Sequence, residues 1–347
     1  MFLSALSALF HLSSIYAALG ASCACSSVTI PVHVDALVPK DPTDIFGGLK
    51  SNPSSLRRVN AIYDVYGVFC QPNTVSLNNA GSYVLQLLVH GFTYTSQYWS
   101  PPVEEFRNYS YAAFSCDQGL ASLAIDWVGV GLSSRPSNAS DVQYATSAAA
   151  VSQLARHLKS SSIIPGVRPF NKIIGIGHSA GSVLLNFDAI VEGPRSPFDG
   201  LILTAALIIR SAGGTIDPAY VTTNNRSLFY PPDSTSFSPR MFIFDEFTKD
   251  VGSLSTFVQV PTTSLTTHFT GPVAKVVGSE DQLFCTGTDR CDNVAALTAA
   301  ERVVWPAARS FEVVVAQGSG HDLNLDFFAQ GPFNTFIRFV DQFAGLS

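Results

Sequence analysis

Apolar stretches alternate along this chain with segments of helical periodicity. Nearly continuous apolar runs at Tyr83–Val89, Leu120–Asp126 and Lys172–Ile176 predict strands that are buried on both faces. Further strands are predicted at Val28–Val34, Ala61–Phe69, Leu201–Leu207, Val273–Val277 and Phe311–Ala316. Helices are predicted at Gln97–Arg107, Asp141–Lys159 with Asp141 as N-cap, Ala180–Val191, and Asp322–Phe343 with an interruption near Gly331-Pro332. Strands that alternate with helices at this interval indicate an α/β fold with a mostly parallel sheet and helices on both faces.

The alternation breaks between residues 208 and 271. This segment is rich in Pro, Ser, Thr and aromatic residues, and a structureless loop of such length is improbable in a compact domain. We interpret it as an inserted cap that covers the site; an irregular surface excursion is the alternative. The predicted organisation is therefore a first core part over 21–207, the cap over 208–271 and a second core part over 272–347.

The first twenty residues have the character of a targeting segment. Met1–Gly20 carries no charged side chain, is mostly apolar and ends in small residues. These features predict a secretory signal peptide over 1–20, cleaved near Gly20 or Ala21, although the usual basic start is missing. A buried helix or a membrane anchor is the alternative. The polar residues within it disfavour the anchor, and no later segment offers a span of about 20 uninterrupted apolar residues. We expect a secreted protein without a stable membrane anchor.

Six cysteines support an oxidising compartment. An even number in a secreted chain favours disulfides, and Cys285 and Cys291 are near enough in sequence to close a short loop. Cys70 with Cys116 is a plausible second pair. Metal binding is disfavoured because the cysteines lack partners at zinc-site spacing. Acceptor sequences for N-glycosylation begin at Asn108, Asn138 and Asn225.

Composition excludes nucleic acid as a partner. Of the 347 residues, 46% are hydrophobic and only 13% are charged, and the net charge is −6. The chain has no cluster of basic residues beyond Arg57-Arg58 to contact a phosphate backbone. The composition indicates a globular protein with a sizeable core, and it leaves the oligomeric state open.

The most informative motif is Gly177-His178-Ser179-Ala180-Gly181. This five-residue pattern occurs by chance in many chains, but here a predicted strand precedes it and a predicted helix follows it. Strand, tight turn and helix make the nucleophile elbow, in which the turn exposes the serine hydroxyl. Ser179 is therefore the candidate nucleophile, and we assign its neighbour His178 no role in proton transfer.

A nucleophilic serine needs a base and an acid that orients the base, and these follow a nucleophile elbow in the order acid, then histidine. His321 follows a late strand on a Gly-rich loop and is the best base; His268, within the predicted cap, is the alternative. Asp281 follows the Val273 strand and is the best acid. Glu280 competes with it, and Asp245 and Asp250 in the predicted cap are less suitable.

The oxyanion formed on attack at a carbonyl needs two hydrogen-bond donors that are already in place. The backbone N–H of Ala180 follows the nucleophile and is one candidate. The backbone N–H of Phe92, in the loop His90-Gly91-Phe92 after the third predicted strand, is the other.

In their order along the chain these motifs resemble the α/β-hydrolase family. The resemblance rests on His90-Gly91, Asp126-x-x-Gly129-x-Gly131-x-Ser133, the Ser179 elbow, Asp281 and Gly320-His321, and it covers the chain from about residue 60 onward. It implies Ser179 as nucleophile, Asp281 and His321 as its partners, and Phe92 and Ala180 as oxyanion donors. Trp127 stands where the family usually has Arg. A serine at the elbow points away from the branches that use aspartate, which are epoxide hydrolases and dehalogenases.

The function predicted from these residues is hydrolysis of a carboxylic ester or lactone through an acyl-enzyme, without cofactor or metal. The aromatic residues of the predicted cap suggest a hydrophobic small-molecule substrate. Alternatives are an aminopeptidase-like amide hydrolase, an acyltransferase or biosynthetic cyclase or lyase on the same fold, and a binding protein with an inactive triad.

Overall fold

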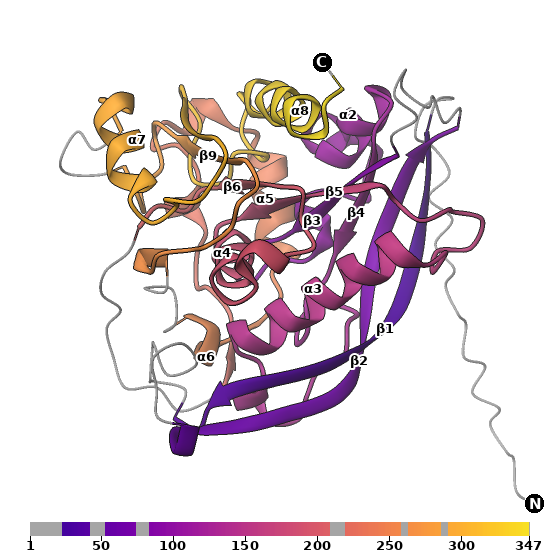
Figure 1. The fold of residues 1–347 in the computed structure, drawn as a ribbon. Coiled ribbons are helices and arrows are strands. Elements are labelled where there is room, and N and C mark those ends of the chain that lie inside the picture. The colour runs from indigo at the N-terminus through magenta and orange to yellow at the C-terminus, as the bar shows by residue number, and fades with distance from the viewer. Residues whose placement is uncertain are drawn as a thin grey trace, which may run out of the picture.

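An eight-stranded sheet forms the centre of the protein (Figure 1). The computed structural model describes residues 23–41, 53–73, 83–208, 219–257, 263–285 and 291–346, so the predicted signal peptide lies outside the described residues. The strand order is β1-β2-β4-β3-β5-β6-β9-β10. The strands are β1 (Cys23–Pro39), β2 (Leu56–Pro72), β3 (Val84–Val89), β4 (Ala121–Ile125), β5 (Lys172–His178), β6 (Gly200–Thr204), β9 (Val273–Gly278) and β10 (Phe311–Ala316).

Most of this sheet is parallel. Strands β4, β3, β5, β6, β9 and β10 pair in parallel, whereas the long hairpin β1–β2 is antiparallel and joins the sheet through β2 and β4. All six positions of β3 are buried, as the continuous apolar run predicts. The parallel strands end at the same edge, so the loops after β3, β5, β9 and β10 meet there.

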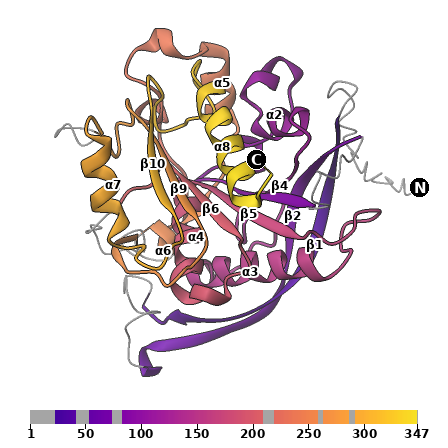
Figure 2. The same cartoon turned by 45° about the horizontal axis from the view of Figure 1, so that its top comes forward.

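Helices cover both faces of the sheet (Figures 1 and 2). Helices α3 (Tyr144–Ser160) and α4 (Ala180–Val191) lie on one face, and α2 (Tyr111–Asp117) and α8 (Gln330–Ala344) lie on the other. Each face has its own apolar core, one including Leu154 and Leu184 and the other including Ile176 and Phe336. Helix α7 (Val294–Arg302) packs beside β10 at the end of the sheet. This arrangement confirms the predicted α/β fold with helices on both faces.

The segment between β6 and β9, which we call the insertion (described residues 205–208, 219–257 and 263–272), joins two neighbouring parallel strands of the sheet. It contains a two-stranded antiparallel sheet of β7 (Tyr220–Val221) and β8 (Gly252–Ser253), and the helices α5 (Pro239–Phe247) and α6 (Leu254–Phe257). Short 3-10 turns at Ser227–Phe229 and Ser234–Ser236 connect them.

Three predicted helices differ from the structure. Residues 97–107 form only 3-10 turns, at Ser96–Tyr98 and Glu104–Tyr109, because Pro101-Pro102 removes two N–H donors from the middle of that segment. Gln143 occupies the N-cap position of helix α3 without a side-chain capping bond, and Asp141 instead pairs with Arg57 at 2.5 Å.

The last of the three, predicted over Asp322–Phe343, begins only at Gln330. Gly331 and Pro332 therefore do not interrupt a helix but lie in its first turn, where a missing N–H has no cost.

Three disulfides join the six cysteines. The predicted bond Cys285–Cys291 is present, but the predicted pair Cys70–Cys116 is wrong. Cys70 bonds to Cys25, its partner in the β1–β2 register, and Cys116 of α2 bonds to Cys23. The sequence prediction failed because it did not anticipate that β1 extends back to Cys23. Within the described residues, no helix is long and apolar enough to cross a membrane.

Candidate active site

The turn that carries Ser179 joins β5 directly to α4. Ser179 has φ 48° and ψ −116°, a left-handed conformation that is unfavourable for a residue with a side chain. The two flanking glycines are required sterically. A Cβ on Gly177 would lie 2.6 Å from the Ser182 nitrogen, and a Cβ on Gly181 would lie 2.3 Å from the carbonyl oxygen of Val89. The strand–turn–helix geometry predicted from the motif is therefore present.

Three of the predicted residues meet at the carboxyl edge of the sheet. The Ser179 hydroxyl lies 2.9 Å from Nε2 of His321, and Nδ1 of His321 lies 2.9 Å from Oδ2 of Asp281. An ionised carboxylate only accepts hydrogen bonds, so in the neutral imidazole Nδ1 carries the proton and Nε2 faces the hydroxyl as an acceptor. His321 and Asp281 are buried, whereas Ser179 is partly exposed. The arrangement allows His321 to take a proton from Ser179.

The competing residues lie elsewhere. Glu280 is exposed, and its carboxylate contacts Ser279 rather than a histidine. His268 is exposed beside Gly193. Asp250 pairs with Arg135 at 3.0 Å, and Asp245 pairs with Arg226 at 2.5 Å.

Electrostatics around His321 favour a protonated imidazole next to an ionised acid. Burial alone lowers the pKa of His321, but the charge and hydrogen bond of Asp281 and the charge of Asp322 outweigh it, so the pKa is raised. Burial raises the pKa of Asp281, but the charge and hydrogen bond of His321 and the N–H groups of Leu283 and Phe284 lower it further, so the net pKa is below its ordinary value. Asp281 is thus suited to stabilise a proton on His321.

Two phenylalanines enclose His321. The Phe284 ring stacks on the imidazole with centroids 5.7 Å apart, and the Phe229 ring of the insertion lies 5.2 Å away at a tilt. These rings place apolar surface against the imidazole of His321.

The two predicted oxyanion donors belong to segments that lie next to Ser179. Ala180 begins α4, and the first N–H groups of a helix have no partner within the helix. The loop that carries Phe92 approaches from β3, where a Cβ on Gly91 would lie 3.3 Å from the Cβ of Ser179. Phe92 itself packs against Gly252 of the insertion, where an added Cβ would lie 2.3 Å from its ring.

The second glycine motif forms a tight turn after β4. The Asp126 carboxylate accepts hydrogen bonds from the N–H groups of Ser96 at 2.6 Å and Leu132 at 3.0 Å. Gly131, at φ +57°, leaves room for that carboxylate, since its Cβ would lie 2.0 Å from Oδ2. Trp127, in the place of the usual Arg, is buried and its ring lies 5.2 Å from that of His90.

Sequence reasoning missed a buried polar cluster behind His321. Its members are the core residues Tyr94, Tyr98, His178 and Asp322 and the insertion residues Arg226, Tyr230 and Asp245, each at most 5% exposed. His178 donates to or accepts from Tyr98 at 3.1 Å and Asp322 at 3.2 Å. Burial and the neighbouring His321 lower the pKa of His178 well below its ordinary value, so it stays neutral. No local signal in the sequence marks Arg226 and Asp245, because the same segment carries other charged residues such as Arg240 and Lys249.

No group of three or more His, Cys, Asp or Glu side chains in the described ranges is arranged to hold a metal ion.

Comparison with a family model assigns most of the chain. Residues 86–330 match the model described as "Alpha/beta hydrolase family". The match spans the loop of Phe92, the Ser179 elbow, Asp281 and His321. A search of curated protein sequences finds no significant match.

Solved structures with the same fold include several hydrolases. An epoxide hydrolase from Vigna radiata has a TM-score of 0.53 and 13% identity, covering 81% of this chain and 95% of that chain. A thermophilic esterase from Thermogutta terrifontis has a TM-score of 0.53 and 13% identity, covering 90% and 99%. Est1E from Butyrivibrio proteoclasticus, solved with ferulic acid, has a TM-score of 0.50 and 15% identity, covering 81% and 95%. At these identities the likeness establishes the fold alone.

Proposed function

This chain belongs to the alpha/beta hydrolase family, and we propose that it is a serine hydrolase that cleaves a carboxylic ester or a lactone through an acyl-enzyme. One observation carries the proposal: His321 bridges the Ser179 hydroxyl and the Asp281 carboxylate with distances of 2.9 Å on both sides. Ser179 is the nucleophile, His321 the general base, and Asp281 orients the imidazole and stabilises its charged form.

The reaction proceeds in two halves. Ser179 attacks the substrate carbonyl while His321 takes its proton, and the N–H groups of Ala180 and Phe92 stabilise the oxyanion. His321 then protonates the leaving alcohol, which departs and leaves an acyl ester on Ser179. Water, deprotonated by His321, attacks this ester and releases the acid.

The serine distinguishes this chemistry from epoxide opening, although epoxide hydrolases share the fold. A serine oxygen that opened an epoxide would form an ether, which the same histidine and water could not cleave. Attack on a carbonyl forms an ester that water can hydrolyse. The site chemistry therefore favours an ester substrate.

The insertion supports a hydrophobic substrate. It contributes the Phe229 ring beside His321, and Phe284 flanks the imidazole as well. We propose that the insertion, corresponding to the cap expected over 208–271, forms part of the substrate site. Residues 209–218 and 258–262 lie outside the described part of it.

Secretion with glycosylation is part of the same proposal. Three disulfides support an oxidising compartment, and the side chains of Asn108, Asn138 and Asn225 are all exposed, as glycan attachment requires. N-terminal sequencing of protein recovered from the medium of a eukaryotic host should begin near residue 21, and glycosidase treatment should reduce its mass. Retention of the first twenty residues would contradict this.

Labelling with a fluorophosphonate probe tests the nucleophile. The wild-type protein should be labelled at Ser179, and Ser179→Ala should be neither labelled nor active. A panel of short-chain, long-chain and aromatic esters, lactones and styrene oxide then tests the substrate class. We expect turnover of esters or lactones and none of the epoxide. Folded wild-type protein that is not labelled would disprove the serine mechanism.

A further inference from the structure

Arg226 is a buried guanidinium that connects the insertion to the loop of a proposed oxyanion donor. Its side chain is 0% exposed. Nη1 donates to Oδ1 of Asp245 at 2.5 Å, and Nη2 donates to the carbonyl oxygen of Thr93 at 2.5 Å. The guanidinium carbon also lies 3.5 Å from the centre of the Tyr94 ring. The planar fork of Arg serves all three contacts at once, which a lysine ammonium cannot do.

Thr93 is the residue after Phe92, and its backbone needs support. Its φ of +64° is left-handed, an unfavourable conformation for a β-branched residue that persists only where the surroundings impose it. The Thr93 carbonyl oxygen accepts a second hydrogen bond from the N–H of Asp250 at 3.0 Å. With Gly252 packed against the Phe92 ring, three residues of the insertion contact this loop.

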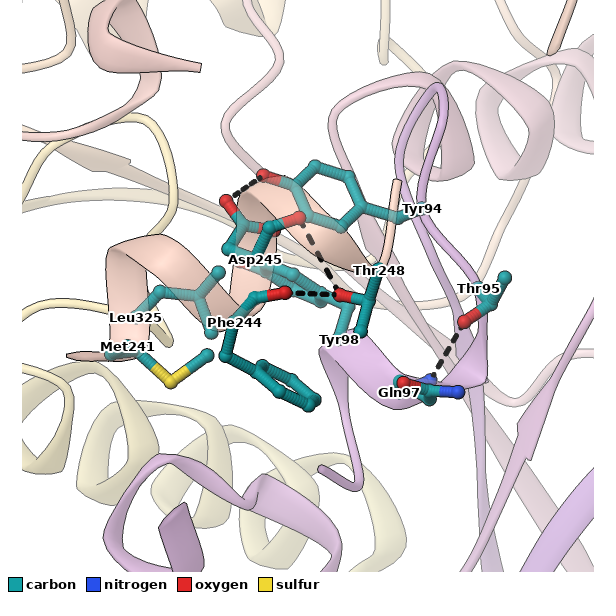
Figure 3. A pocket seen from close by; sticks show the side chains of 9 residues that line it. All are labelled: Tyr94, Thr95, Gln97, Tyr98, Met241, Phe244, Asp245, Thr248 and Leu325. Atoms are coloured by element: carbon teal, nitrogen blue, oxygen red, sulfur yellow. Dashed lines mark hydrogen bonds between the residues drawn. The ribbon is translucent and has the colours of Figure 1, made fainter. Parts of the chain in front are cut away.

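The contacts of Arg226 extend to the loop of His321. The Tyr94 hydroxyl lies 3.3 Å from Oδ2 of Asp245, a contact drawn in Figure 3, and both residues line a cavity of about 10 Å³, space for about one water molecule. The Tyr94 hydroxyl also donates to Asp322, the residue after His321. Tyr230 donates to Asp245 at 3.1 Å. The insertion thus contacts Tyr94, which precedes Ser179 in the chain, through Asp245, and His321, which follows it, through the Phe229 ring.

We propose that Arg226 is a positioning residue for the oxyanion loop: by holding the Thr93 carbonyl it keeps the Phe92 N–H directed at the place where the oxyanion forms. The inference rests on the proposed serine hydrolase function. Its physical basis is that donors stabilise a transition state only when they are held in place beforehand, and a displacement of about 1 Å costs up to about 100-fold in rate. The insertion therefore takes part in transition-state stabilisation, in addition to lining the substrate site.

Two variants separate the Thr93 contact from the buried ion pair. Arg226→Lys keeps a cation near Asp245 but loses the fork that reaches Thr93. The double variant Arg226→Met with Asp245→Asn removes both charges, so no unpaired charge is left buried. Arg240→Met is the matched control, because Arg240 lies on α5 of the same insertion and is 77% exposed in a pair with Glu105.

Three quantities are measured on each variant: kcat and KM for the best ester, the inhibition constant of phenylboronic acid, and the number of sites titrated by the fluorophosphonate. Phenylboronic acid forms a tetrahedral anion on the serine and so reports on the oxyanion donors, whereas KM reports mainly on ground-state binding. Referring kcat to titrated sites removes the contribution of misfolded protein.

We expect both Arg226 variants to lose about 10- to 100-fold in kcat per titrated site, to lose phenylboronic acid affinity by a similar factor, and to change KM little. The Arg240→Met variant should match the wild type. If the Arg226 variants keep the wild-type kcat per titrated site, or if only their KM is raised, the positioning role is overturned while the proposed function stays intact. A wild-type protein that neither reacts with the probe nor hydrolyses an ester would instead overturn the proposed function.

Discussion

His178 and His321 face each other with ring centroids 5.2 Å apart, and each is hydrogen-bonded to a different aspartate. His321 contacts Asp281 at 2.9 Å, and His178 contacts Asp322 at 3.2 Å. The two histidines have opposite protonation behaviour, because the pKa of His321 is raised and that of His178 is well below its ordinary value. Only one of them therefore takes up a proton near neutral pH.

This difference predicts the pH dependence of the wild-type rate. His321 must be neutral to act as a base, so kcat/KM should fall as the pH drops through its pKa. Since that pKa is raised, the midpoint should lie above the ordinary histidine value of about 6.5. Because His178 stays neutral, a plot of log kcat/KM against pH should have a limiting acid slope of one. A slope of two would contradict the assignment.

Asp281→Asn tests which carboxylate orients His321. Removing the charge leaves burial to dominate, so the pKa of His321 should drop and the acid limb should move to lower pH. The maximal rate should fall by about 10³- to 10⁴-fold, as expected when the orienting acid is lost. Glu280→Gln is the control, because Glu280 is adjacent and exposed. A large loss of rate in Glu280→Gln with little loss in Asp281→Asn would reverse the assignment.

Gly181→Ala should destroy the elbow. The added Cβ would lie 2.3 Å from the Val89 oxygen and 2.4 Å from the His90 oxygen, and neither backbone group can move without shifting β3. We expect a loss of at least about 2 kcal/mol in stability, typical of overpacking, and loss of probe labelling. Gly331→Ala, in the first turn of α8, meets no atom within 4 Å and should leave the urea midpoint unchanged or slightly higher. Labelling of Gly181→Ala at the wild-type level would contradict the close approach of Gly181 to the Val89 and His90 carbonyl oxygens.

The sequence predicts most of the central sheet because its signals are local. A run such as Tyr83–Val89 marks a strand buried on both faces, and a nucleophile elbow needs glycines at fixed spacing around Ser179. Parallel strands then bring the loops after them together without further information, which is why Asp281 and His321 could be selected before their distances were known.

The features that sequence reasoning missed depend on packing between distant segments. Arg226 is defined by its contacts with Thr93 and Asp245, 133 and 19 residues away in the chain. No local pattern at Arg226 distinguishes it from a surface arginine. The same reason explains the wrong pairing of Cys70, because its true partner depends on the register of the β1–β2 hairpin.

Removal of disulfides should destabilise the protein in order of the loop that each closes. The bonds Cys23–Cys116 and Cys25–Cys70 span 93 and 45 residues, whereas Cys285–Cys291 spans 6. Loop-closure entropy predicts losses of about 4 to 5 kcal/mol for each of the longer two and about 2 kcal/mol for the short one. Paired Cys→Ser variants in urea unfolding give these values. Equal losses for all three would show that native contacts, not chain entropy, dominate.

Asp188 should make stability depend on pH at a position remote from Ser179. It lies on α4, is 1% exposed, and accepts hydrogen bonds from the Ser152 and Ser196 hydroxyls. Burial raises its pKa to about 6, although these two bonds partly offset the shift. Between the unfolded value near 3.8 and about 6, the native state holds the proton more tightly than the unfolded chain. Its contribution to stability is therefore present at low pH and is lost as the pH rises through this window.

The Asp188→Asn variant isolates this contribution. Its amide cannot ionise and can still bond to both serine hydroxyls. The difference in unfolding free energy between variant and wild type should therefore change by up to about 3 kcal/mol from pH 4 to pH 7. The variant should be favoured at the higher pH. Other buried carboxyls with raised pKa values, such as Asp326, are common to both proteins and cancel in the difference. Urea midpoints at half-unit pH steps measure it. A difference that stays flat across the range would mean that Asp188 is ionised at no energetic cost, and hence that its surroundings are more polar than the two serine contacts alone provide.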